Sequence, residues 1–325
     1  MKDETDIELA SSDVVINSNG KTRGIPGVFF VLFAHLLWGM TPLYTNLMDG
    51  ISLFEIIAHR VIWSLPGVFF AVVYFSKGLS LLKSAVKNTK VLLWLAGSAF
   101  FLACHWGVFL FALLSHRGFE TALSFYISPL LSIALGSLLL NEKWNKLQVI
   151  ATSLTTIALL IMTIYNGIPV LSLAIAVTWS VYCFTRKSIP ATPNEGMFIE
   201  MCCLAVPALL FVLLLGTNML PDINMMTYIM ENKRFLQNVP DTLLLMGYGL
   251  LNSIAFCFFA YGIKNTRLST VGIMDYVAPT MMAINTVIIL KQPVSNVDLV
   301  VFFIIVFALF IYVIPSFLNS RKQNS

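Results

Sequence analysis

The sequence predicts an all-α polytopic membrane protein with ten transmembrane helices, arranged as two inverted five-helix repeats. The first observation is composition: 58% of the 325 residues are hydrophobic and 11% are charged, whereas about a quarter of a soluble domain is charged. The second is that apolar runs of about 20 residues, the length that crosses a bilayer, recur along the chain. The third is a motif that both halves share. Such a chain leaves no room for a large soluble catalytic domain.

The first repeat is expected at residues 27–166. Its apolar runs place transmembrane helices near residues 27–47, 56–76, 91–114, 119–140 and 147–165. A short turn around Asn166 and Gly167 separates this repeat from the next one. The expected first repeat therefore contains five spans joined by short loops.

The second repeat is expected at residues 167–318. Its apolar runs place helices near residues 168–186, 196–217, 241–263, 268–290 and 296–318. Tails at 1–26 and 319–325 lie outside both repeats. The N-terminal tail is polar and mostly acidic, unlike a cleavable signal peptide with its basic start. We expect it to be disordered.

The distribution of basic residues predicts the orientation, because cytoplasmic loops retain Lys and Arg. If the N-terminus is cytoplasmic, most of the 20 Lys and Arg residues lie on that side. An even number of spans then returns the chain to the cytoplasm, so both termini are expected there. The basic residues are spread over short loops, which indicates topology and not nucleic-acid binding.

One motif occurs in the fourth span of each half. At a single constant shift, Arg117, Tyr126 and Pro129 align with Arg267, Tyr276 and Pro279, each half reading Arg, a spacer and Tyr-x-x-Pro. Because each unit has five spans, the second copy must insert upside down. Inverted repeats can open a midplane site alternately to each side.

The two prolines of this motif are candidate hinges. Pro129 and Pro279 are expected near the middle of their spans, where proline removes a backbone hydrogen bond and kinks the helix. The alternative is that both are ordinary membrane prolines, which neighbouring helices tolerate.

Ionisable side chains inside the spans are candidates for function, because they are costly in hydrocarbon and face the bundle interior. The candidates are His35, His59, Arg60, His105, Glu200 and Asp275. Asp275 shares a helical face with Pro279, so it either couples protons or contacts substrate, or it is the structural partner of a cation such as Arg60. Arg60 either faces the cavity or snorkels to the interface.

Aromatic and imidazole groups complete the predicted cavity. His105 and Trp106 fall in the middle of the third span, where the imidazole either serves a ligand or proton or makes a helix-to-helix hydrogen bond. Trp38, Tyr126 and Tyr276 are expected to line the same space, which suits partly apolar ligands. Aromatic residues near span ends are alternatively interfacial anchors.

Several kinds of site are not indicated by the sequence. The five cysteines include no CxxC pair and fall in apolar stretches, which favours packing over a metal site or disulfide framework. No nucleotide-binding or hydrolase motif is present. We therefore expect no cofactor and no metal, and we expect uphill transport to use an ion gradient, with protons as one candidate.

Four strings carry a family resemblance. They are Trp38-Gly39 with Pro42 and Tyr44; Glu55-Ile56-Ile57-Ala58-His59-Arg60-Val61-Ile62-Trp63-Ser64; Phe125-Tyr126-Ile127-Ser128-Pro129-Leu130 with Asn141-Glu142-Lys143; and Arg267-Leu268-Ser269-Thr270 with Tyr276 and Pro279-Thr280. On these strings the chain resembles the RarD family within the EamA group of the drug/metabolite transporter superfamily, from about residue 27 to 318.

The resemblance implies a ten-helix inverted-repeat permease of the bacterial inner membrane with a central cavity between its halves. The family's named representative is linked to chloramphenicol sensitivity. This chain departs from the family pattern at three places: His105 replaces a more usual asparagine, Asp275 an uncharged polar residue, and Lys291-Gln292 a Gly-Glu pair. The first two alter the expected cavity.

The leading hypothesis is a secondary transporter that exports a small metabolite or amphipathic drug, such as a chloramphenicol-like compound, by alternating access. Its partners would be the substrate, the lipid bilayer and a coupling proton; a homodimer is left open. One alternative is a non-transporting membrane regulator or assembly subunit, which predicts no ligand-sized polar cavity between the halves. The other is a membrane-embedded enzyme, which requires catalytic groups that converge near one interface.

Overall fold

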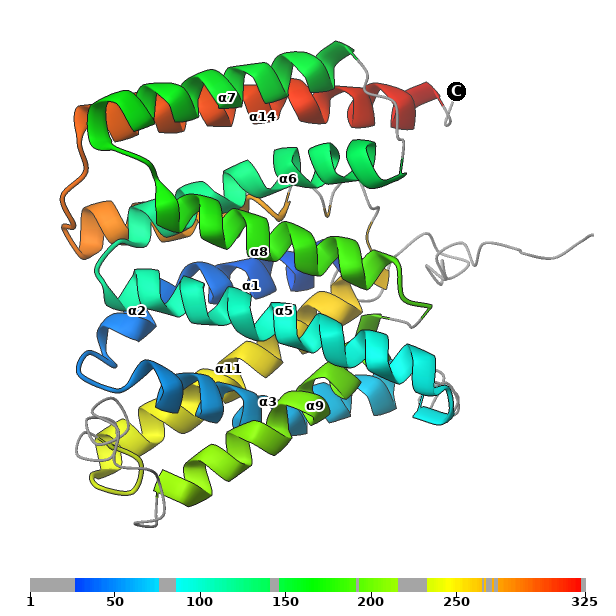
Figure 1. The fold of residues 1–325 in the computed structure, drawn as a ribbon, viewed down its shortest axis with the longest axis vertical. Coiled ribbons are helices and arrows are strands. Elements are labelled where there is room, and N and C mark those ends of the chain that lie inside the picture. The colour runs from blue at the N-terminus through cyan, green and yellow to red at the C-terminus, as the bar shows by residue number, and fades with distance from the viewer. Residues whose placement is uncertain are drawn as a thin grey trace, which may run out of the picture.

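The computed structural model describes residues 27–75, 86–140, 146–190, 193–215, 233–264, 266, 271 and 274–322, and within these ranges the regular elements are helices. In chain order they are α1 (Gly27–Gly39), α2 (Thr41–Asn46), α3 (Leu53–Phe75), α5 (Thr89–Leu114), α6 (Gly118–Leu140), α7 (Lys146–Asn166), α8 (Val170–Lys187), α9 (Pro193–Leu215), α11 (Val239–Lys264), α13 (Val277–Ile284), the π-helical turn η1 (Asn285–Ile289) and α14 (Asn296–Lys322). Figure 1 shows their arrangement.

Six helical segments are long and apolar enough to cross a membrane. They are Gly27–Asn46, Leu53–Tyr74, Thr89–Leu114, Lys146–Asn166, Asn194–Leu215 and Val239–Gly262. Shorter apolar helices cover Val170–Arg186, Val277–Ile289 and Asn296–Ile311. This confirms an all-helical, polytopic membrane protein.

The polarity of the fold is the reverse of that of a soluble domain. Large apolar side chains point outward, among them Phe70, Leu160, Ile164, Phe303 and Phe307. Charged and polar groups such as Arg60, His105 and Glu200 are buried. Lipid solvates the first group, and the second lies inside because hydrocarbon offers no hydrogen bonds.

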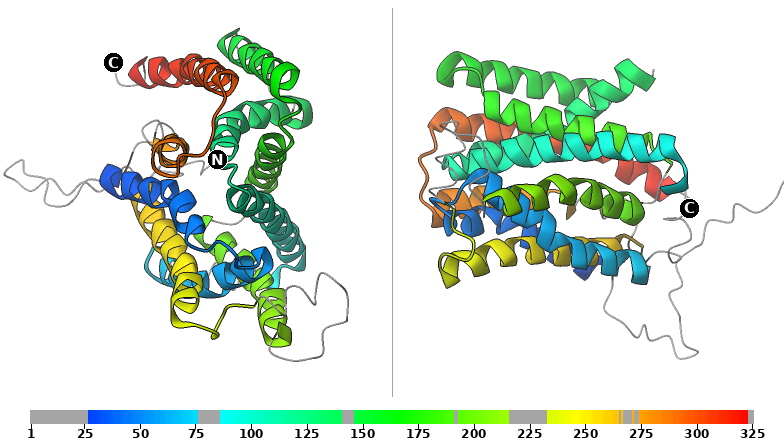
Figure 2. Two further views of the ribbon diagram at one scale, coloured as in Figure 1. Left: turned by 90° about the vertical axis from the view of Figure 1, so that its left-hand side faces the viewer. Right: turned by 60° about the horizontal axis from the view of Figure 1, so that its bottom comes forward.

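The helices pack in pairs that join distant parts of the chain. α11 packs against α3 and α1, α8 packs against α5 and α6, and α9 packs against α3 and α5. α13 lies between α1 and α6, while α7 and α14 pair with each other at one end of the molecule (Figure 1). Viewed from its side in Figure 2, the α1–α11 pair lies opposite the α5–α8 pair. The halves are therefore interleaved.

The first predicted span, 27–47, is confirmed as one apolar helical segment at Gly27–Asn46, but the helix is interrupted at Met40 between α1 and α2. Pro42 is at the second position of α2 and has no N–H to donate to the carbonyl of Trp38. The Thr41 hydroxyl donates to that carbonyl instead, at 2.6 Å. Pro42 thus interrupts the series of helical backbone hydrogen bonds, and the Thr41 side chain supplies the donor that the Trp38 carbonyl would otherwise lack.

The ninth predicted span, 268–290, is also not one regular helix. Asp275 and Tyr276 form a turn directly before α13, and the last turns are π-helical from Asn285. Pro279 therefore lies in the first turn of α13, where backbone N–H groups have no intrahelical partner. The predicted loss of a mid-helix hydrogen bond at Pro279 was wrong, whereas Pro129 does lie inside α6.

The remaining predicted spans differ from the observed helices only at their ends. α14 continues to Lys322, so it extends into the segment 319–325 that was predicted to be a tail. The N-terminal tail, 1–26, and the motif residue Arg267 lie outside the described residues.

Candidate functional site

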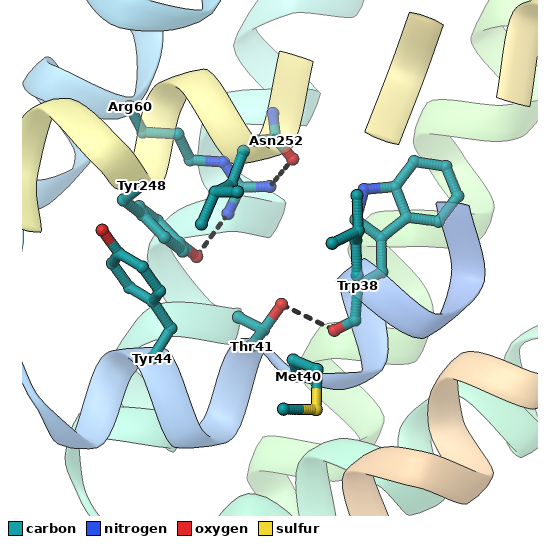
Figure 3. A pocket seen from close by; sticks show the side chains of 9 residues that line it. Trp38, Met40, Thr41, Tyr44, Arg60, Tyr248 and Asn252 are labelled. Carbon is teal, nitrogen blue, oxygen red and sulfur yellow. Dashed lines mark hydrogen bonds between the residues drawn. The ribbon is translucent and has the colours of Figure 1, made fainter. Parts of the chain in front are cut away.

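A small cavity with one polar wall lies where the break between α1 and α2 faces α3 and α11. Its volume is about 70 Å³, and its lining comes from the broken first span, from α3 and from α11 (Figure 3). The lining residues are Leu37, Trp38, Met40, Thr41, Tyr44, Arg60, Tyr248, Leu251 and Asn252. Drug-sized ligands occupy about 300–1,000 Å³, so this conformation accommodates a functional group and not a whole drug.

Arg60 supplies the charge of this cavity. Its side chain is buried, with Nη1 donating to the Tyr248 hydroxyl at 2.9 Å and Nη2 donating to Asn252 Oδ1 at 3.1 Å. The guanidinium carbon lies 4.2 Å from the centroid of the Trp106 ring, a cation–π distance. Arg60 therefore does not snorkel, and it does not pair with Asp275.

Contacts with α13 and the residue after it, Asn285, hold the backbone at the break between α1 and α2. Asn285 donates through Nδ2 to the carbonyl of Gly39 at 2.9 Å. A Cβ on Gly39 would come within 2.6 Å of the Met281 Cβ, so only glycine lets the two backbones approach this closely. The irregular backbone at Met40 is thus hydrogen-bonded within the protein, as irregular backbone at membrane depth must be.

Asp275 pairs with His35, a candidate residue for which the sequence indicated no partner. The Nε2 atom of His35 lies 3.0 Å from Asp275 Oδ1, with His35 buried and the carboxylate half exposed. The other ring nitrogen of His35 lies 2.8 Å from the Val31 carbonyl oxygen. The expectation that Asp275 partners a cation such as Arg60 was wrong in its choice of residue.

His35 also adjoins the cavity. Its ring packs edge-on against Trp38, one turn further along α1, with centroids 5.3 Å apart. Trp38 also lines the cavity. Its side chain therefore contacts both His35 of the His35–Asp275 pair and the space beside Arg60.

Tyr126 of α6 and Tyr276, directly before α13, are the two tyrosines of the repeated motif, and their side chains are in contact. Their rings stack with centroids 6.0 Å apart, and the Tyr126 hydroxyl hydrogen-bonds Thr280. The lining of the Arg60 cavity includes neither tyrosine. The predicted site residues therefore do not all line this cavity.

His105 makes a contact between helices. Its Nδ1 lies 3.3 Å from Thr178 Oγ1 on α8, and its ring packs 4.9 Å from that of Trp179. Of the two roles left open for His105, the structure shows the helix-to-helix hydrogen bond.

The Glu-Ile-x-x-His-Arg-x-x-Trp-Ser string of α3 forms its contact with α11 and the segment before it. Glu55 accepts the backbone N–H groups of Arg234 and Phe235 through Oε1, at 3.1 and 2.8 Å. His59 accepts from the indole of Trp63 at 3.2 Å, and Ser64 donates to a carbonyl of α11 at 3.0 Å. Residues before and after Arg60 in α3 thus anchor this part of the helix to α11 and to the segment before α11.

A second buried charged cluster lies on α5, α8 and α9. Glu200 accepts from Ser98 at 2.6 Å and from Tyr182 at 3.1 Å, and Arg186 Nε lies 3.2 Å from its carboxylate. This carboxylate is therefore paired and fully hydrogen-bonded, which suits a structural role.

Sequence reasoning missed three polar residues of the cavity: Thr41, Tyr248 and Asn252. Asn252 carried a usable signal, because an amide inside an apolar span needs a partner. Thr41 could have been found from Pro42, since the residue before proline tends to leave the helix.

Comparison with known proteins identifies the family of this chain. A profile of the EamA-like transporter family matches residues 25–164 and again residues 167–314. The chain belongs to the EamA-like transporter family. It is therefore a multi-pass membrane transporter, and the family implies a small-molecule substrate.

Among the relatives of this EamA-like transporter are RarD proteins. Protein RarD of Escherichia coli strain K12 is 28% identical over 301 residues, covering 92% of this chain and 97% of that protein. Chloramphenicol-sensitive protein RarD of Pseudomonas aeruginosa is 26% identical, covering 82% and 86%. These matches assign the chain to the RarD group and place it in the inner membrane. One solved structure matches with a TM-score of 0.57 at 18% identity, covering 88% of this chain and 96% of that one, which supports the fold alone.

Proposed function

We propose that this protein is a secondary transporter that exports a small metabolite or amphipathic drug, chloramphenicol-like compounds included, by alternating access. The observation that carries the proposal is the position of the Arg60 cavity. It lies between α1–α3 of the first family match and α11 of the second, beside a broken helix. Transporters built from inverted repeats bind their substrates at such repeat interfaces, next to discontinuous helices.

The packing of the helices supports two inverted repeats at 27–166 and 167–318. Suppose that α1, α3, α5, α6 and α7 correspond to α8, α9, α11, α13 and α14. Exchanging the halves then converts each of the larger helix contacts into another larger contact or into itself. The α1–α11 pair becomes α8–α5, and the α1–α13 pair becomes α8–α6. The α3–α9, α6–α13 and α7–α14 pairs become themselves. In alternating access, such paired contacts would exchange between two states.

The coupling ion we propose is a proton held by His35 and Asp275. The Val31 carbonyl can only accept, so the His35 Nδ1 atom carries a hydrogen. The 3.0 Å contact between Nε2 and Asp275 Oδ1 then needs one further proton between these two atoms. Loss of that proton would leave the imidazole one hydrogen for two acceptors, the Val31 carbonyl and the Asp275 carboxylate, so one of the two contacts would be lost. Cys183 of α8 also lies within electrostatic range of Asp275.

This arrangement would link protonation to the two broken spans. The pair joins α1 to the turn before α13, and Trp38 connects His35 to the cavity. An inward proton gradient that exchanges a proton for substrate would drive the substrate outward. Export with both termini in the cytoplasm is therefore the proposed direction and orientation.

Flux in proteoliposomes tests this function. Labelled chloramphenicol and a panel of labelled metabolites would be followed with and without an imposed proton gradient, in wild type, Asp275→Asn and the exposed control Asp49→Asn. We expect gradient-dependent flux of at least one compound in wild type and Asp49→Asn, and its loss in Asp275→Asn. Unchanged flux in Asp275→Asn would reduce Asp275 to a structural residue.

The same assay separates the other functions. No flux of any compound would favour a non-transporting membrane regulator or assembly subunit. Membership of a transporter family supports our proposal that the protein is not an enzyme, and chemical change of a panel compound would contradict it.

A further inference from the structure

We propose that the Arg60 cavity binds the carboxylate of a small organic anion, so that the substrate class is an amphipathic monocarboxylate. This inference rests on the proposed transport function and narrows it to one chemistry. A neutral compound of the chloramphenicol type lacks the group that Arg60 would hold.

The first reason is an uncompensated charge. Arg60 is 7% exposed, and its partners in the described part of the chain are the neutral Tyr248 and Asn252 and the ring of Trp106. No carboxylate lies within ion-pair distance of it in the part of the chain that the structure describes. Buried charges are normally paired. By contrast, Arg186 of α8 and Glu200 of α9 form an ion pair inside the same protein.

The second reason is an excess of donors. A guanidinium has five N–H donors and no acceptor, and Arg60 uses two of them in the bonds to Tyr248 and Asn252. The Tyr248 hydroxyl accepts from Arg60, so its own hydrogen remains to be donated. The Asn252 oxygen is already occupied, and the Thr41 hydroxyl donates to a backbone carbonyl. A cavity with spare donors and one positive charge matches a carboxylate, which accepts only.

The third reason is the shape of the lining. Beside the polar wall of Arg60, Tyr248 and Asn252, the cavity is bounded by Trp38, Tyr44 and apolar side chains (Figure 3). The volume of about 70 Å³ admits a carboxylate but not a complete aromatic acid. The apolar part of the ligand therefore lies against the aromatic wall and requires the cavity to widen, which movement at the adjacent helix break would allow.

An anionic cargo also agrees with export. The bacterial membrane potential is negative inside, so outward movement of an anion is electrically favourable. Exchange of one such anion for one proton would draw on both the potential and the proton gradient.

Ligand binding to the purified full-length protein in nanodiscs tests the site. Phenylacetate would be compared with its neutral isostere phenylacetamide, with tryptophan fluorescence and melting temperature as readouts, since Trp38 and Trp106 flank Arg60. We expect a response to phenylacetate only. Loss of a charge-assisted hydrogen bond should weaken that binding about tenfold in Tyr248→Phe and more in Arg60→Gln, whereas the exposed control Arg117→Gln should bind normally.

Three outcomes would overturn the proposal. One is an equal response to phenylacetamide, and another is unchanged phenylacetate binding in a monodisperse Arg60→Gln. The third is a chloride site: stabilisation by chloride that phenylacetate cannot increase or displace. If Arg60→Gln does not fold, Tyr248→Phe decides, because it removes one hydroxyl and keeps the ring. Phenylacetate binding without any flux would support the carboxylate site and contradict the transport function. Flux of neutral compounds alone would support the transport function and contradict the carboxylate site.

Discussion

The imidazole of His35 and the carboxylate of Asp275 meet at 3.0 Å across the contact between α1 and the turn that precedes α13. Both partners lie next to a break in a membrane helix: α1 ends at Gly39, and α13 begins at Val277. The contact joins two spans of opposite halves, and one of its members packs against a side chain of the Arg60 cavity. Coupling between protonation and helix movement would be carried by this pair.

The Glu200 cluster should be essential for stability. Glu200→Gln removes the charge that faces Arg186 and leaves a largely buried cation with weaker compensation. Breaking a buried pair costs about 3–5 kcal/mol, so we expect a clearly lower melting temperature in detergent. Glu120→Gln is the matched control, because its partner Arg117 is half exposed and such pairs contribute about 0–1 kcal/mol. Equal shifts in the two variants would contradict this account.

The α3–α11 contact depends on a small residue. A Cβ at Gly249 would come within 2.6 Å of the Trp63 Cβ and 3.0 Å of two backbone carbonyls of α3. Gly249→Ala should therefore push the helices apart, lower the melting temperature and disturb Arg60. Gly97→Ala in α5 has open space around its new methyl group and should be neutral or stabilising by up to about 1 kcal/mol. The prediction fails if both variants melt like wild type.

Lys291 has a left-handed backbone conformation, with φ of 51°. It lies directly before Gln292, whose side chain accepts the N–H of Gly118 at the start of α6. Because this conformation costs a non-glycine residue about 1–2 kcal/mol, Lys291→Gly should raise the melting temperature or leave it unchanged. A marked decrease would show that the Lys291 side chain makes a stabilising interaction.

The break at Met40 should be sensitive to Asn285. Asn285→Ala leaves the carbonyl of Gly39 without its side-chain donor, and a buried polar group without a partner costs about 1–3 kcal/mol. We expect a lower melting temperature and reduced flux. Asn166→Ala, which removes an exposed amide bonded to Asp298, should change the melting temperature little. Normal flux in Asn285→Ala would separate the break from transport.

The general architecture was accessible from the sequence because lipid imposes a simple rule. Apolar runs of spanning length predicted the helices from α3 to α11 with small errors at their ends. The breaks in the first and ninth spans were missed, because apolar composition alone does not show that the helix is interrupted before Pro42 or that Asp275 lies in a turn.

The candidate site was predictable only in part. The cost of burying charge identified Arg60 and Asp275 as candidates. The structure buries Arg60 as expected but leaves the Asp275 carboxylate half exposed. The cost of burial could not give their partners, because Asn252 lies on α11 and His35 on α1, far away in the sequence. Pairing across helices depends on how the halves interleave, and periodicity within one span carries no such information.

The most direct test of the central claim compares two modes of transport in the same Asp275→Asn proteoliposomes. One is accumulation of a transported compound driven by a proton gradient, and the other is exchange of labelled for unlabelled compound with no gradient. Because exchange needs the substrate site and helix movement but no net proton transfer, we predict that Asp275→Asn loses accumulation and retains exchange. Gradient-driven accumulation at the wild-type rate in Asp275→Asn would contradict the account.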